Sequence, residues 1–121
     1  MAHHLRAKPE DAICVYHGTT LENGKKIMEE GFKVGGRSGH IAANGTALGC
    51  GVYTGIGPDV PLRYSFSTSG GGSGVLVLAL ALKGSTVGHH ERDGGDSWTG
   101  TGDVVVFKDA RQLLPKYLLH F

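Results

Sequence analysis

The chain has 121 residues, the usual size of one domain, so we expect residues 1–121 to form a single unit with one core. Twelve Lys and Arg residues stand against eleven Asp and Glu residues, and this balance argues against a broad surface that follows nucleic-acid phosphates. The 21 glycines are well above the usual share and predict a domain rich in loops.

Neither the cysteines nor the apolar segments indicate a disulfide-rich or membrane protein. Cys14 and Cys50 are too few for a disulfide framework, and we expect both to be reduced thiols. The longest apolar run, VLVLALAL at 75–82, fits a buried strand and is too short for a membrane span. With no apolar signal segment at the start, we expect no membrane association and favour a cytoplasmic or nuclear location.

The first expected elements are a strand, AICVYH at 12–17, and a helix that follows it. Thr19 and Glu22 have the T-x-x-E spacing of a capping box, so we expect the helix to begin just after Thr19. Apolar residues then recur at helical spacing up to Gly31, which is placed to stop the helix in a left-handed turn. Phe32 is expected to pack back on the apolar face of the helix.

The rest of the chain alternates short apolar runs with polar, glycine-rich segments. We expect a loop at 33–50, a short strand at 52–53, a helical turn at 58–65, a flexible connection at 67–74, strands at 75–82 and 103–107, a loop at 83–102, and a last strand at 116–121. Mostly strands with one clear helix predict an α+β fold, with two short, mainly antiparallel sheets around a cleft. Two long loops in so small a domain are typical of functional segments.

Five motifs, in order along the chain, resemble those of the catalytic domains of poly(ADP-ribose) polymerases and related mono-ADP-ribosyltransferases. VYHGTTLENGKKIMEEGF resembles that family's opening strand, H-G-[ST], helix and final G-F, and LGCGVYTG resembles its G-x-G-[IV]-Y signature. Tyr64 follows Tyr53 by eleven residues, which is the family's separation between its two pocket tyrosines. DSWTG resembles the family's D-S-x-x-G piece, and VVVFKDARQLLPKYLL resembles its closing strands. The likeness extends from Ile13 to the C-terminus.

This resemblance implies a small ADP-ribosyltransferase-like fold with a cleft for NAD⁺, and it implies roles for particular residues. His17 is expected to hydrogen-bond the adenosine ribose, and the backbone of Gly18 to hold the nicotinamide carboxamide, with Thr19 completing the motif. Tyr53 and Tyr64 are expected to sandwich the nicotinamide ring, which needs flat apolar faces. The residues alone agree with this interpretation, because His17 stands at a strand end and Gly18 allows a ligand to approach the backbone closely.

One departure from the family pattern lies in the expected helical turn. In many members a serine three residues before the second tyrosine donates a hydrogen bond to the carboxamide, and here that place is Pro61. Proline has no backbone donor, so one contact to nicotinamide is missing or is replaced. We expect Ser65 or a backbone group to replace it.

A second departure concerns the residue at the head of the closing strand. Polymerising members carry a glutamate there, and many mono-transferases carry an apolar residue. Counting back from Phe107 places Asp103 at this position, whereas counting from Gln112 places Val104 there. We prefer Asp103, because the strand VVVF anchors the count better than the loop that follows it.

A carboxylate at that position would have a clear chemical task. Breaking the bond between nicotinamide and ribose builds positive charge on the sugar, as in glycoside hydrolysis. A carboxylate bound to the ribose 2′-hydroxyl stabilises that charge in the transition state, and such a bond contributes roughly 1.5–3 kcal/mol. Because aspartate is one methylene shorter than glutamate, we expect transfer of a single ADP-ribose or hydrolysis, without chain elongation.

Other candidate groups have simpler interpretations. His89, His90, Glu91 and Asp93 lack any recognised metal-ligand spacing, so we interpret them as a solvated loop and expect no metal. Trp98 is expected to pack or to rim the cleft.

The resulting hypothesis is an NAD⁺-dependent mono-ADP-ribosyltransferase that acts on a macromolecule, with a protein favoured over a nucleic acid. Residues 33–49 are expected to border the donor site, and residues 84–102 to contact the acceptor. The alternatives are a catalytically degenerate module that binds NAD⁺, ADP-ribose or a partner, an RNA 2′-phosphotransferase, which shares the H-G-T opening, and an NAD⁺ glycohydrolase.

Overall fold

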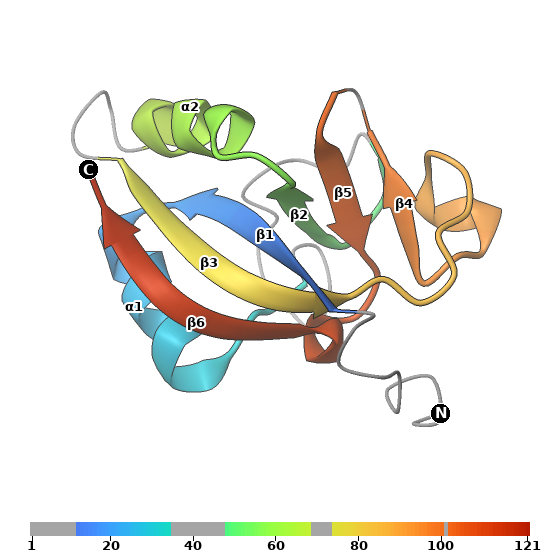
Figure 1. The fold of residues 1–121 in the computed structure, drawn as a ribbon, viewed down its shortest axis with the longest axis horizontal. Helices are drawn as coiled ribbons and strands as arrows, with labels where there is room; N and C mark the ends of the chain where they lie inside the picture. Colours follow the sequence, from blue (N-terminus) through green and yellow to red (C-terminus); the bar gives the residue numbers. More distant parts are fainter. Residues whose placement is uncertain (1–11, 35–47, 69–73, 101) are drawn as a thin grey trace.

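The structure is a computed structural model that describes residues 12–34, 48–68, 74–100 and 102–121. It confirms the predicted α+β class, with two α-helices and a sheet (Figure 1). The elements are β1 (Ala12–Thr19), α1 (Leu21–Glu30), β2 (Val52–Gly55), α2 (Asp59–Thr68), β3 (Val75–Leu82), β4 (Ser97–Thr99), β5 (Val104–Phe107) and β6 (Leu113–His120), with 3₁₀ turns η3 (Glu91–Asp93) and η4 (Ala110–Gln112). Most of the loop expected at 33–50, and part of the connection expected at 67–74, lie outside the described residues.

The described strands form one antiparallel sheet in the order β4-β5-β2-β1-β3-β6, rather than two separate sheets. The two halves of this sheet are joined weakly. β1 pairs with β3 along its whole length, from Ala12 to Thr19. It pairs with β2 at one position only, where Tyr16 lies opposite Gly55. Continuing that register would set Tyr53 opposite Gly18. Instead β1 and β2 part there, and this opening in the sheet positions the candidate site.

The start of α1 differs from the prediction by one residue. Thr19 is the last residue of β1, and Thr20 is the N-cap, whose hydroxyl accepts a hydrogen bond from the Asn23 N–H at 3.2 Å. The prediction that Thr19 caps the helix was wrong, because Thr19 pairs with Val75 of β3 and stays in the extended strand. Gly31 ends the helix with a positive φ of 86°, as expected, and its N–H donates to the Ile27 carbonyl. Its ψ of 175° is extended rather than left-handed helical.

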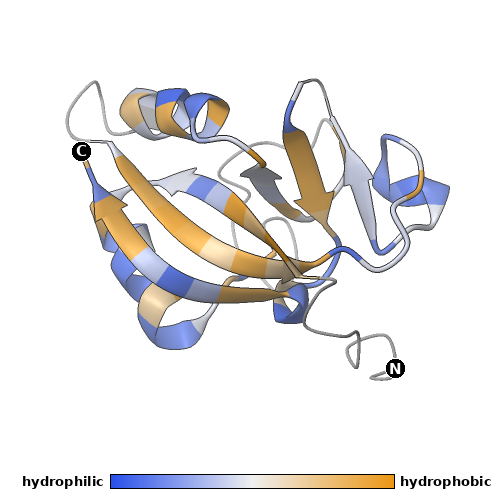
Figure 2. Ribbon diagram, viewed as in Figure 1, coloured by the Kyte–Doolittle hydropathy of each residue, from blue (hydrophilic) through white to orange (hydrophobic). Residues whose placement is uncertain are grey.

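The core lies between α1 and the face of the sheet that α1 covers. β3 is buried along most of its length, as its apolar run predicts (Figure 2). Phe32 is 6% exposed and packs in the same cluster as Ile27 and Met28, which confirms the predicted return of the chain onto the helix. The buried members of this cluster are Val15, Phe32, Val52, Val77, Ala79, Ala81, Val105, Phe107 and Leu113.

Helix α2 covers the end of β1 on the other face of the sheet. A Cβ at Gly18 would collide with the Pro61 carbonyl, so the helix approaches this strand more closely than any side chain would allow. Ser65 is fully buried, donates from its hydroxyl to the Thr19 carbonyl at 2.6 Å and accepts from the Val75 N–H at 2.7 Å. The helical turn expected at 58–65 is part of α2, which continues to Thr68. The two hydrogen bonds of Ser65 attach this helix to the sheet.

The described residues of the loop expected at 83–102 contain more regular structure than we predicted. Strand β4 lies at the sheet edge beside β5, and Ser97 is buried with its hydroxyl donating to the Lys83 carbonyl. Trp98 is fully buried, which supports the packing interpretation. β5 begins at Val104, and β6 begins at Leu113, three residues before the predicted last strand. No helix in the described ranges is long and apolar enough to cross a membrane.

Candidate functional site

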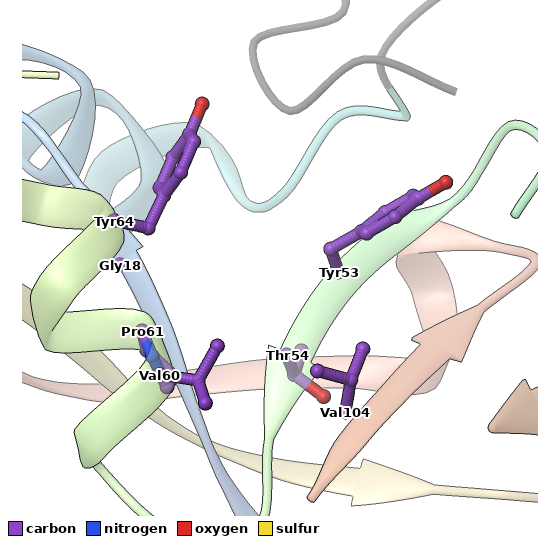
Figure 3. Close-up of a pocket in the computed structure, with 7 residues that line it drawn as sticks. All are labelled: Gly18, Tyr53, Thr54, Val60, Pro61, Tyr64 and Val104. Atoms are coloured by element: carbon purple, nitrogen blue, oxygen red, sulfur yellow. The ribbon is translucent and has the colours of Figure 1, made fainter. Parts of the chain in front are cut away.

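A cleft of about 180 Å³ opens where β1 and β2 part, with α2 on one side and the head of β5 on the other. Pockets for drug-sized ligands measure roughly 300–1,000 Å³, so this cleft has room for a single flat ring rather than for a whole dinucleotide. The residues that line it are Gly18, Tyr53, Thr54, Val60, Pro61, Tyr64 and Val104 (Figure 3).

Tyr53 and Tyr64 stand on opposite sides of this cleft, one on β2 and the other on α2, with a gap between their rings (Figure 3). The Tyr53 hydroxyl accepts from the Leu48 N–H at 2.9 Å and donates to the Gly49 carbonyl at 2.8 Å. Burial raises the pKa of both tyrosine hydroxyls, so both stay neutral at pH 7. The fold thus brings the two predicted pocket tyrosines to one cleft.

His17 lies beside the cleft and does not line it. Its Nδ1 lies 2.8 Å from the carbonyl oxygen of Tyr53. Because a carbonyl can only accept, Nδ1 carries the hydrogen, and Nε2 of the neutral ring is left as an acceptor. Burial lowers the pKa of His17, and this outweighs the raising effect of the bond to Tyr53, so the ring is neutral at pH 7. Phe32 meets the ring edge-on, with centroids 5.3 Å apart.

Gly18 is the one residue of the H-G-T motif that lines the cleft. Its missing side chain also makes room for Pro61, so the glycine serves the packing of α2. Thr19 is buried and its carbonyl accepts the Ser65 hydroxyl hydrogen. Ser65 does not line the cleft and its only hydroxyl hydrogen is used in that bond. The expectation that Ser65 replaces the carboxamide donor is therefore wrong.

The structure places Val104, and not Asp103, in the cleft. Val104 is the first residue of β5, lies opposite Gly55 and lines the cleft. Asp103 is exposed in the preceding turn, where its carbonyl accepts from the Ile56 N–H at 3.0 Å. We expected Asp103 at the head of this strand, but pairing with β2 makes Val104 its first residue, and a count along the chain does not contain that register.

The lining of the cleft is largely apolar around its two tyrosines. Val60, Pro61 and Val104 contribute no polar side-chain atom, and the Thr54 hydroxyl donates to the Val105 carbonyl at 2.8 Å. Specific polar contacts to a ligand would therefore come mainly from backbone groups.

The groups His89, His90, Glu91 and Asp93 form hydrogen bonds within and beside η3. Among the described residues, no three His, Cys, Asp or Glu side chains lie together as a metal site. Sequence reasoning missed the contact between Glu91 and Cys50, whose backbone N–H donates to Glu91 Oε1 at 2.9 Å. The two residues are 41 positions apart, so no local pattern could have indicated it.

A scan against protein-family models finds no family that matches the chain, and a search of curated proteins finds no match either.

Proposed function

We propose that the cleft binds the nicotinamide end of NAD⁺ and that the protein transfers a single ADP-ribose to a macromolecular acceptor, for which we favour a protein. One observation carries this proposal. Tyr53 and Tyr64 come from separate motifs and separate elements, yet they stand on opposite sides of one cleft whose volume suits one aromatic ring (Figure 3). An aromatic ring between two aromatic faces gains both apolar burial and stacking.

The state of His17 supports the same ligand. Its bond to the Tyr53 carbonyl leaves Nε2 as an acceptor, and a ribose hydroxyl is a suitable donor for it. Because the cleft holds only one ring, the adenosine half of NAD⁺ would lie outside it, on the side of His17. Gly18 is paired with Leu76 of β3 but not with β2, and it lines the cleft, which supports a contact between its backbone and the carboxamide.

The chemistry breaks one bond and forms another. The bond between the nicotinamide nitrogen and ribose C1′ breaks, and its electron pair leaves with neutral nicotinamide. An acceptor nucleophile then bonds to C1′ and loses its proton. Val104 supplies no carboxylate to stabilise the cationic sugar, and losing such a contact slows a reaction roughly 10- to 100-fold. The apolar residue is therefore compatible with slow single transfer.

A second candidate is a module that binds NAD⁺ or ADP-ribose without catalysis. Two observations favour it: Val104 lines the cleft where a carboxylate would act, and Pro61 lines it where a donor would act. An RNA 2′-phosphotransferase is less well supported, because no Lys or Arg is among the described residues that line the cleft. Hydrolysis of NAD⁺ differs from transfer only in using water as the acceptor.

The experiment measures nicotinamide release from NAD⁺ by the purified protein, with the intact mass of the protein and of added acceptor read in the same tube. Tyr53→Ala is the test variant, and Tyr117→Ala is the control, because Tyr117 is exposed on β6 and does not line the cleft. We expect release that Tyr53→Ala abolishes and Tyr117→Ala preserves, with an added ADP-ribose mass. If release is absent but calorimetry detects NAD⁺ binding, the second candidate is established, and the absence of both would contradict both candidates.

A further inference from the structure

The hydroxyl of Tyr53 is held by two backbone groups that belong to no helix or strand. Leu48 donates to it and Gly49 accepts from it, at 2.9 and 2.8 Å. The hydroxyl is at the far end of the ring, so these two bonds fix the tilt of the ring that walls the cleft. The geometry of this wall therefore depends on whatever holds the segment Leu48–Cys50 in place.

Glu91 contacts all three residues of the segment Leu48–Cys50. Its backbone N–H donates to the Leu48 carbonyl at 3.1 Å, and its Oε1 accepts from the Cys50 N–H at 2.9 Å. Gly49, with a φ of 95°, lies directly against the Glu91 side chain, and a Cβ at Gly49 would collide with Glu91 Cβ. One residue thus holds the backbone on both sides of the group that accepts the Tyr53 hydrogen.

The turn that carries Glu91 is itself well held. Asp93 Oδ2 accepts from the backbone N–H groups of His89 and His90 at 2.9 and 3.1 Å. His90 Nδ1 accepts from the Arg92 N–H at 3.1 Å, which completes the cap of η3. Glu91 is therefore presented to the segment Leu48–Cys50 from a turn whose shape its own hydrogen bonds maintain.

We propose that Glu91 is a positioning residue for the aromatic wall of the cleft: it holds Leu48–Cys50, and this segment holds the Tyr53 ring. Glu91 is not among the described residues that line the cleft, so we expect it to act on a ligand through the segment Leu48–Cys50 and Tyr53. The identity of the ligand rests on the proposed function above, but the physical link from Glu91 to Tyr53 does not. A carboxylate that accepts from a backbone N–H makes a stronger bond than a neutral acceptor, and glutamine would keep a weaker version of it.

The test compares Glu91→Ala with Glu91→Gln and with Asp96→Ala. Asp96 is the matched control, since its carboxylate lies in the same stretch between β3 and β4 and accepts from the Ser85 N–H and hydroxyl at 3.0 and 3.3 Å. A general loss of order in this stretch would affect Tyr53 in the Asp96 variant as well, whereas a specific role of Glu91 would not.

The first readout needs no ligand: it is the titration of the Tyr53 hydroxyl, followed by NMR of ¹³C-labelled tyrosine and assigned with Tyr53→Phe. Burial raises the pKa of Tyr53 above 10.0. We expect Glu91→Ala to move the midpoint down toward 10.0, with Glu91→Gln and Asp96→Ala close to the wild type. An unmoved Tyr53 in Glu91→Ala, or an equal movement in Asp96→Ala, would overturn the proposal.

The second readout is NAD⁺ affinity by calorimetry. We expect Glu91→Ala to bind more weakly by up to about tenfold, the limit reached if the whole cost of losing the charged bond to Cys50 appears in the affinity. Glu91→Gln should restore most of the affinity. A moved Tyr53 midpoint with unchanged affinity would overturn the role in ligand binding. If the wild type does not bind NAD⁺, the proposed function fails, while the tyrosine titration still decides whether Glu91 positions Tyr53.

Discussion

The two sides of the cleft differ in polarity: hydrogen bonds fix the residues of one side, and apolar side chains form the other. On the side of β2, backbone groups hold the hydroxyl of Tyr53 in one orientation, and the carbonyl of Tyr53 holds His17 in one orientation. On the side of α2, the wall around Tyr64 is apolar, with Val60 and Pro61 at its surface (Figure 3). The difference indicates that one side orients a ligand and the other mainly excludes water. Such a site recognises a ring well and supplies little charge for chemistry.

The largest expected effect comes from Gly18, where the two sides meet. In Gly18→Ala the new Cβ would collide with the Pro61 carbonyl, so α2 must move away from β1. We expect the free energy of unfolding to fall by about 3 kcal/mol, the upper end of what overpacking costs. Urea unfolding measures this change. Gly57→Ala is the control, because its Cβ would meet only the Asp103 carboxylate, at 3.3 Å, and an equal loss there would contradict the account.

The orienting side can also be examined through the pH dependence of stability. Because the pKa of His17 is lowered below 6.5 in the folded protein, the unfolded chain binds more protons between the two pKa values. The contribution of His17 to stability is therefore full above pH 6.5 and is lost as the pH falls through the folded pKa. In urea titrations at a series of pH values, we expect His17→Gln to show a smaller loss toward acid than the wild type. Identical profiles would mean that His17 is not buried in the neutral form.

The smallest effect is expected from Asp103, which is exposed in the turn before β5 and does not line the cleft. Asp103→Ala should change nicotinamide release or NAD⁺ affinity by less than about twofold, as is usual for exposed substitutions of about 0.5 kcal/mol or less. Val104→Ala, which enlarges the cleft, should have a greater effect on both. If Asp103→Ala abolishes release and Val104→Ala does not, the assignment of Val104 to the cleft is incorrect.

The parts of the fold that could be predicted carry strong local signals. The apolar run at 75–82 gave the bounds of β3, and the glycine after α1 marked the end of that helix. The resemblance to the family's motifs implied that Tyr53 and Tyr64 share a cleft, and both line the same cleft in the structure. These features depend on residues that are close in the chain or on short motifs, so they can be read without knowing the tertiary structure.

The features that could not be predicted depend on contacts between distant segments. Ser65 appeared available for a ligand, but the docking of α2 on β1 commits its hydroxyl to Thr19. The short strand β4 has no apolar pattern that would predict it. It forms by antiparallel pairing with β5. The choice between Asp103 and Val104 depended on the pairing of β5 with β2, which a count along the chain does not contain.

The most direct test of the central claim compares the affinities of NAD⁺ and ADP-ribose by calorimetry, in the wild type and in Tyr53→Ala. NAD⁺ carries the cationic nicotinamide ring where ADP-ribose carries a hydroxyl, so a difference in affinity that depends on Tyr53 reports whether that ring is bound. If the ring lies between Tyr53 and Tyr64, the wild type should bind NAD⁺ roughly tenfold more tightly than ADP-ribose, from stacking and burial of the ring, and Tyr53→Ala should lose that preference. Equal affinities in the wild type, or a preference that survives in Tyr53→Ala, would contradict the account.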